Sequence, residues 1–181
     1  MSPEAAGGGK APPGFGPAGY ALLATSRVLA LAGGGVFVAL VAMSVVSITG
    51  RKLASAPIPG DVEILQMSAA FASASFFAYC HLMGGDVKVD FFTSFLRASF
   101  VRWLDAFGSL LYALIGAALA WRTAAGAIAV RAAEESSVVL GWPTWIAQIL
   151  MVPGFILMAL AGMYMISVHL HRAPREASGG A

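Results

Sequence analysis

Three histidines are the residues of this sequence best suited to hold a cofactor. His81 ends one long apolar run, and His169 and His171 end another. Haem held between membrane helices needs axial histidines at a similar depth on facing helices. All three are predicted near one membrane surface, so one pair is geometrically conceivable. We favour the simpler interpretation of polar residues at helix C-termini, where a partly cationic ring is stabilised. A haem- or quinone-binding membrane anchor of an oxidoreductase stays open as the alternative.

The sequence carries no other pattern typical of catalysis or metal binding. It has no Gly-rich phosphate loop, no Cys/His metal spacing and no nucleophile motif. The single cysteine, Cys80, lies in an apolar run and is interpreted as a small buried hydrophobe. We therefore predict no catalytic residue, no cofactor, no metal and no enzymatic activity.

The ionisable residues also argue against a self-sufficient carrier. An ion-coupled carrier usually places an ionisable group deep within a helix. Here Glu63 and Asp105 both lie near the starts of predicted helices. A small autonomous exporter that acts as a dimer is a further alternative, but the sequence favours a scaffold.

The composition is that of a membrane protein. The chain has 181 residues, of which 59% are hydrophobic and 11% are charged, whereas roughly a quarter of residues in soluble domains are charged. Basic residues stand at the ends of apolar runs, where they serve as membrane anchors, so we expect contact with membrane lipids and no nucleic-acid partner.

Four apolar runs predict an all-α integral membrane protein with four transmembrane helices. A crossing needs roughly 20 apolar residues at about 1.5 Å each. The predicted helices cover residues 28–49, 62–83, 103–121 (with a possible extension to 131) and 145–168. Asp61 is predicted as the N-cap of the second helix, with Glu63 in its first turn. The predicted division is a disordered cytoplasmic tail (1–26), a four-helix membrane domain (27–172) and a disordered tail (173–181).

An amphipathic segment separates the second and third predicted helices. Read as a helix, residues 90–103 place apolar residues on one face and Asp90 and Arg97 on the other. This pattern predicts an arm helix lying in the membrane interface. The residues assigned to the interfacial arm are Phe91, Phe92, Phe95, Leu96, Arg97 and Trp103. The charged residues either keep the arm at the surface as a solvated loop or fix it against a partner or lipid headgroups.

Small residues recur every four positions in the predicted helices. Such stripes let helix backbones approach closely in a membrane. We interpret these stripes as surfaces for packing within the bundle, and the alternative is that they form a docking face for another subunit. The candidate partner-interface residues are Glu63, Ala70, Ala74, Ala78, Asp90, Gly116, Ala120 and Trp145.

The distribution of basic residues predicts the orientation. The two tails and the central segment together carry seven Lys and Arg residues, against four in the other two loops. Cytoplasmic segments are enriched in these residues, so both termini and the arm are predicted to be cytoplasmic.

Several of these elements together resemble a known family. They are the sequence GGDVKVDFF that contains Asp90, the basic segment from Arg97 to Asp105, and the element with Glu135, Trp142, Pro143 and Trp145. In this order they resemble the small membrane subunit, DctQ-like, of the tripartite ATP-independent periplasmic (TRAP) transporters. The similarity covers residues 27–172.

The resemblance implies a role as an accessory subunit. It implies a large multi-helix membrane transport subunit that carries the substrate and sodium sites, and a periplasmic substrate-binding protein that delivers an organic acid. The small subunit would be a multi-pass protein of the bacterial inner membrane. It would act as a scaffold that stabilises the large subunit during sodium-coupled uptake by symport.

Overall fold

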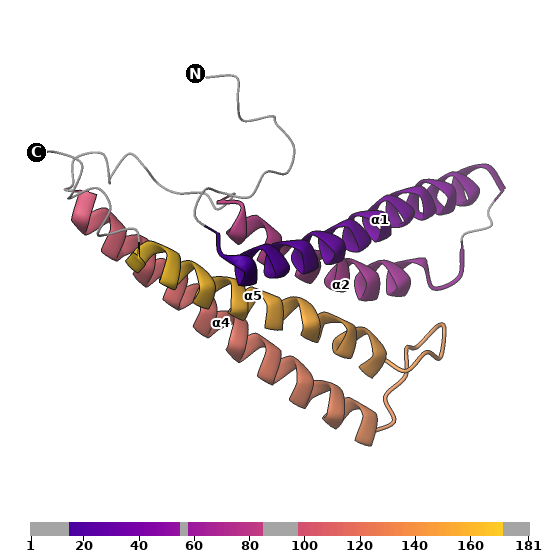
Figure 1. Cartoon of the computed structure of the whole chain (residues 1–181). Helices are drawn as coiled ribbons and strands as arrows, with labels where there is room; N and C mark the ends of the chain where they lie inside the picture. The colour runs from indigo at the N-terminus through magenta and orange to yellow at the C-terminus, as the bar shows by residue number, and fades with distance from the viewer. Residues whose placement is uncertain (1–14, 55–57, 85–97, 172–181) are drawn as a thin grey trace, which may run out of the picture.

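The computed structural model describes residues 15–54, 58–84 and 98–171 (Figure 1). In these ranges it contains four α-helices, which are α1 (Pro17–Ala54), α2 (Asp61–Leu82), α4 (Ala98–Ala132) and α5 (Trp145–His171). The only β-type pairing in the described residues is an isolated bridge between Ser136 and Pro143. The predicted all-α fold is confirmed.

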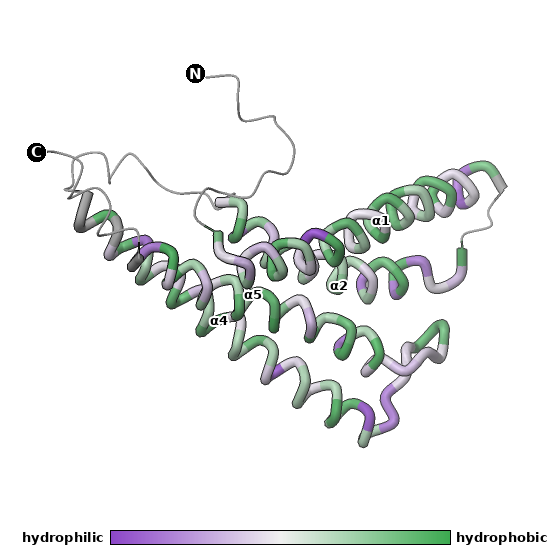
Figure 2. Tube along the Cα trace, viewed as in Figure 1, coloured by the Kyte–Doolittle hydropathy of each residue, from purple (hydrophilic) through white to green (hydrophobic). Residues whose placement is uncertain are grey.

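Three of the four helices are long and apolar enough to cross a membrane. The candidate spans are Pro17–Leu53, Trp103–Ala132 and Trp145–His169, and Figure 2 shows apolar residues distributed along these helices. The fourth, α2, has 22 residues and is not among the spans. Its composition explains the difference, because it combines acidic residues at its start with several serines and His81. Crossing of the membrane by α2 therefore stays a prediction.

All four helices differ from their predicted ranges at one end or both, and the largest differences are in α1 and α4. The first helix begins at Pro17 instead of residue 28, so residues 17–26, assigned to the disordered tail, are helical. Proline is well suited to the first position of a helix, and Leu23 in this stretch is buried against residues of α2 and α5. The helix α4 continues to Ala132, which confirms the longer of the two predicted bounds.

The predicted arm is described only at its end. Residues 85–97, which include most of the arm, lie outside the described residues. The last part, residues 98–103, belongs to the continuous helix α4 and does not form a separate element. Trp103 is 72% exposed on this helix.

The helices form two antiparallel hairpins that pack against each other. In Figure 1, α1 pairs with α2 and α4 pairs with α5, and the hairpins meet where α2 packs on α5. At one end of the bundle α1 and α4 begin and α2 and α5 end, and we call this the tail end. At the other, the loop end, the α4–α5 loop reaches the start of α2.

Glycines bring the helix backbones together at each contact. An added Cβ at Gly33 of α1 would lie 2.8 Å from Ser75 Cβ of α2, and one at Gly154 of α5 would lie 2.7 Å from the Ala74 carbonyl oxygen. A Cβ at Gly116 of α4 would lie 2.8 Å from a backbone nitrogen of α5. Such distances leave no room for a side chain. Two of the predicted stripe residues, Ala74 and Gly116, therefore pack within this chain.

The interior between the helices is nearly free of charge. Among the described residues, the buried polar side chains are four serines and His81. Two of the serines, Ser26 and Ser75, donate their hydroxyl protons to carbonyls one turn earlier, at 2.8 and 2.9 Å. Such internal bonds satisfy a hydroxyl without a partner on another helix.

Candidate functional site

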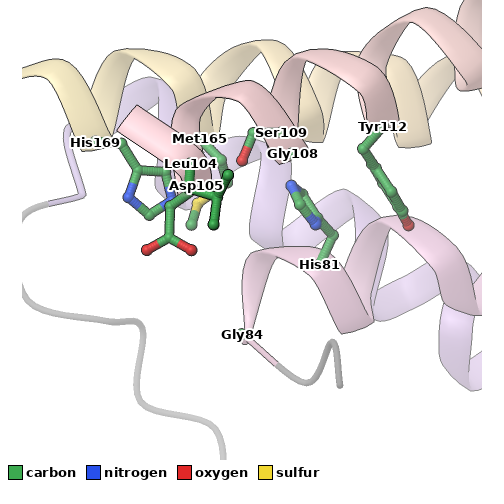
Figure 3. A pocket seen from close by; sticks show the side chains of 9 residues that line it. All are labelled: His81, Gly84, Leu104, Asp105, Gly108, Ser109, Tyr112, Met165 and His169. Carbon is green, nitrogen blue, oxygen red and sulfur yellow. The ribbon is translucent and has the colours of Figure 1, made fainter. Parts of the chain in front are cut away.

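A cavity lined by both polar and apolar residues lies at the tail end of the bundle. Its volume is about 390 Å³, and it is enclosed by the end of α2, the start of α4 and the end of α5 (Figure 3). Its walls are formed by His81, Gly84, Leu104, Asp105, Gly108, Ser109, Tyr112, Met165 and His169. Three helix ends are needed to assemble this set, and each contributes at least one polar side chain.

Stacking and a hydrogen bond hold one side of this cavity. His81, in the last turn of α2, is 7% exposed, and its ring lies flat on that of Tyr112 of α4, with 4.0 Å between centroids and 12° between planes. The Tyr112 hydroxyl donates to the Phe77 carbonyl at 2.7 Å. Tyr112 therefore fixes the distance between α2 and α4 and covers one face of the imidazole.

The opposite side of the cavity carries His169 and Asp105. Figure 3 shows these two side chains on the same side of the cavity, with His81 and Tyr112 on the other. His81 and His169 therefore line the same cavity from opposite sides. In the described part of the chain, no group of three or more His, Cys, Asp or Glu residues could hold a metal ion.

At the loop end, Glu63 holds the α4–α5 loop. Its carboxylate accepts a hydrogen bond from the Ser137 hydroxyl, one from the Val139 N–H at 3.0 Å and one from the Leu140 N–H at 3.1 Å. We call these four residues the Glu63 latch. The sequence analysis proposed Glu63 for a partner interface, but its carboxylate oxygens are engaged within the chain.

Asp61 joins the two helices of the first hairpin. The N-cap prediction for Asp61 is wrong, because Gly60 occupies that position with φ 74°, a conformation that favours glycine. The Asp61 carboxylate instead accepts from the Ser47 hydroxyl at 2.5 Å and from Arg51 at 3.2 Å, both on α1. The Ser47 hydrogen bond, aided by the Val62 N–H and by Arg51, lowers the pKa of the Asp61 carboxyl below its usual value.

This interaction predicts a pH dependence. Because the pKa of Asp61 is lower in the folded state, its contribution to stability is present above the unfolded-state pKa, about 3.9, and is lost as the pH falls through the folded-state value. We expect Asp61→Asn to lower the Tm of the detergent-solubilised chain at pH 7, with a smaller difference between variant and wild type at pH 3. Equal differences at the two pH values would contradict this role.

The predicted partner-interface residues of the helices face into the bundle. Ala74 and Ala78 are buried in clusters with residues of α5, and Gly116 approaches Ala159 of α5. Ala70 is half-buried, and Ala120 packs beside Ala74, Phe155 and Met158. Contact of this set with a partner stays a prediction.

Trp145 also makes a contact within the chain. The Arg131 guanidinium carbon lies 5.1 Å from the centroid of the Trp145 ring, a geometry that favours a cation–π interaction. The contact joins the end of α4 to the start of α5. Asp90 and five residues of the arm lie outside the described residues, namely Phe91, Phe92, Phe95, Leu96 and Arg97.

Sequence reasoning did not identify the donors of the Glu63 latch. Two of them are backbone N–H groups, of Val139 and Leu140, whose residue types carry no signal of this role. Ser137 lies 74 positions from Glu63. The one available signal was an acidic residue at a helix start together with a Ser- and Gly-containing loop.

Comparison with known proteins yields one match. The model of a family described as tripartite ATP-independent periplasmic transporters, DctQ component, matches residues 40–172. The matched region begins within α1 and includes all of α2, α4 and α5. Searches among curated proteins and among solved structures give no match.

Proposed function

Because this chain belongs to the DctQ component family of the tripartite ATP-independent periplasmic transporters, we propose that it is the accessory scaffold subunit of a sodium-coupled importer of organic acids. Membership itself makes the chain a membrane component of a transporter that also has a large permease and a periplasmic binding protein. We propose in addition that transport is coupled to sodium, that the substrate is an organic acid, and that this chain stabilises the large subunit.

The uncharged interior supports a scaffold. A transport path through a bundle usually requires ionisable or polar groups between the helices. In the part of the chain that the structure describes, the closest contacts between helices involve glycine and alanine, and the buried polar side chains are four serines and His81. The ion pair between helices, Arg51 with Asp61, lies at the loop end of the bundle. This packing supports a rigid element beside the moving transport domain.

We propose a four-helix arrangement in the bacterial inner membrane. The antiparallel packing of α2 between α1 and α5 favours its insertion alongside the three apolar helices. The start of α1 and the end of α5 lie together, with the Gly16 N–H donating to the Tyr164 hydroxyl at 3.0 Å. Because the two tails and the central segment together carry seven Lys and Arg residues, against four in the other two loops, we place both termini and the interfacial arm on the cytoplasmic side.

The outer helices supply the surface for the proposed partners. Large apolar side chains are exposed on α1 and α4, for example Val38 at 72% and Trp121 at 76%. Contiguous exposed apolar surface is typical of a membrane or protein contact. We propose that the large transport subunit covers part of this surface and lipid the rest, while the binding protein delivers substrate at the periplasmic side.

Deletion of the gene tests the proposal. We expect the deletion to abolish sodium-dependent uptake of the labelled organic acid that the intact transporter imports, and a plasmid copy to restore it. The tagged chain should co-purify with the large subunit, and the amount of large subunit in the membrane should fall in the deletion strain. Normal uptake after deletion would overturn the scaffold role.

Reconstitution separates the scaffold from an autonomous carrier. The purified chain alone in vesicles should give no flux with or without a sodium gradient, whereas all three components together should. Flux by this chain alone would favour an exporter instead. The family match is to a transporter component, so it gives no support to the alternative of a haem- or quinone-binding anchor, which we do not propose.

A further inference from the structure

The residues at the start of α1 pack against two other helices at the tail end. Phe15 is 8% exposed and belongs to one buried cluster with residues of α1, α2 and α5, among them Leu23, Leu82 and Ala161. One phenylalanine is therefore shared by both hairpins. We propose that residues 15–20, called here the N-terminal clasp, are a conformational lock that holds the first hairpin to α5, and that its release lets the two hairpins move relative to each other.

The clasp is held by Tyr164 of α5. The ring of Phe15 meets the Tyr164 ring edge-on, with 5.2 Å between centroids and 75° between planes, a geometry that favours attraction between aromatic rings. The Gly16 N–H donates to the Tyr164 hydroxyl at 3.0 Å. This N–H lies just before α1, where N–H groups have no acceptor within the helix. The Tyr164 hydroxyl therefore supplies an acceptor that α1 itself does not provide.

The absence of a side chain at Gly19 makes this contact possible. An added Cβ at Gly19 would lie 2.5 Å from Tyr164 Cζ and even closer to the hydroxyl oxygen, so the tyrosine ring lies directly on the backbone of α1. An added Cβ at Gly16, by contrast, would meet nothing within 4 Å. The two glycines of the clasp therefore form a matched pair, in which only Gly19 must lack a side chain.

Beyond the clasp, α1 packs mainly on α2. Gly33 approaches Ser75, and the rings of Phe37 and Phe76 stack with 5.9 Å between centroids, whereas α1 contacts α5 far less extensively. The first hairpin is therefore joined to the second chiefly where α2 packs on α5. The angle between two packed helices varies by about 15–20° around its preferred value, so one such contact leaves the hairpins some freedom to rotate.

The α2–α5 contact lies between two attachments. Its closest approach is at Gly154, where an added Cβ would lie 2.7 Å from the Ala74 carbonyl oxygen. The Glu63 latch joins the start of α2 to the α4–α5 loop at the loop end, and the clasp joins α1 to α5 at the tail end (Figure 1). Rotation of one hairpin about the contact of Ala74 with Gly154 would strain both attachments. The clasp and the latch together therefore fix the angle between the hairpins.

Most of the clasp lies outside the region that matches the family. The match covers residues 40–172, so Tyr164 is inside the matched region and residues 15–20 are outside it. Membership of the family therefore gives no reason to expect the clasp, which is inferred from the contacts of this chain alone.

Gly19→Ala tests whether Tyr164 holds the clasp. The added methyl group should displace the Tyr164 ring without disrupting α1, because alanine is a better helix former than glycine. In the full chain reconstituted in lipid nanodiscs, we expect the Gly16 amide to exchange with deuterium about tenfold faster, as for the loss of one hydrogen bond. Tyr164→Phe, which removes only the acceptor, should accelerate this exchange by a similar factor.

A distance measurement tests whether the clasp holds the hairpins together. Spin labels are attached to Val28→Cys of α1 and Met163→Cys of α5 in a chain that also carries Cys80→Ser, since Val28 and Met163 are 68% and 62% exposed. We expect one narrow distribution of distances between the labels when the clasp is intact. Phe15→Ala and Gly19→Ala should each broaden this distribution. An unchanged distribution in either variant would overturn the proposal, because the hairpins would then stay fixed without the clasp.

Two controls separate release of the clasp from other effects. Gly16→Ala retains the N–H and has room for its Cβ, so it should keep the wild-type exchange rate and distances. If Gly16→Ala and Gly19→Ala broadened the distribution equally, contact with Tyr164 would not be the cause and the proposal would be wrong.

The second control uses labels within one hairpin. Ile128→Cys of α4, at a position that is 69% exposed, is paired with Met163→Cys of α5. The distance between these labels should be the same in all variants. Broadening here as well would mean that the whole bundle had loosened, which contradicts a lock between hairpins. Uptake is not measured, so the result is independent of the scaffold role.

Discussion

Replacing Gly116 with leucine is expected to lower the Tm of the purified chain by about 6–12 °C and to disrupt the α4–α5 hairpin. A Cβ at this position would lie 2.8 Å from the Ala159 backbone nitrogen and 3.1 Å from its Cα. A helix backbone cannot move aside as a flexible side chain can. Overpacking of this kind costs about 3 kcal/mol at its upper range, and each kcal/mol corresponds to about 2–4 °C for a chain of this size.

A glycine of α5 also lies very close to the backbone of α4. A Cβ at Gly162 of α5 would lie 2.7 Å from the Ala113 backbone nitrogen of α4. Gly162→Leu should therefore have a similar effect. Because both substitutions disrupt one contact, the double variant should be less destabilised than the sum of the two. Thermal unfolding in detergent measures these differences.

Gly108 provides the control for this prediction. It lies on α4, two turns before Gly116, and an added Cβ there would meet nothing within 4 Å. Gly108→Leu also replaces a poor helix former with a good one, so its Tm should equal that of the wild type or exceed it. If Gly116→Leu were as stable as Gly108→Leu and still bound the large subunit, the assigned α4–α5 contact would be wrong.

Glu63→Gln is expected to release the α4–α5 loop while the helices stay folded. The substitution keeps the shape of the side chain but removes the charge and turns an acceptor into an NH₂ group that faces N–H donors. Hydrogen bonds to an ionised acceptor are the stronger ones. We expect chymotrypsin to cleave after Leu140 on the order of ten times faster, and the amides of Val139 and Leu140 to exchange faster with deuterium.

Glu135→Gln is the matched control for the Glu63 latch. Glu135 is an exposed residue of the same loop, and in the described structure only its backbone carbonyl and N–H have hydrogen bonds. This variant has the same change in charge but should be cleaved at the wild-type rate. If both variants were cleaved equally fast, the total charge of the loop region, and not the Glu63 latch, would determine how well the α4–α5 loop is ordered. Loss of uptake in Glu63→Gln would further indicate that the ordered loop is needed in the transporter.

The helices themselves could be predicted from the sequence with useful accuracy. The second predicted helix, residues 62–83, differs by one residue at each end from α2 (Asp61–Leu82), and the last predicted helix begins at Trp145 as α5 does. Proline, glycine and acidic residues mark these starts chemically. The start of α1 was missed because glycine and proline before Pro17 suggested a tail, whereas Leu23 is buried against another helix.

Local sequence determined which residues form helices and which faces carry small residues, because backbone propensity and the 3.6-residue repeat act over a few positions. Only the tertiary structure decided what each face meets. It placed Ala74 against Gly154, Glu63 against Leu140, and His81 and His169 on opposite sides of one cavity. The physical reason is that a stripe of small residues permits close approach to any helix, and the partner and register depend on the contacts of all the helices together.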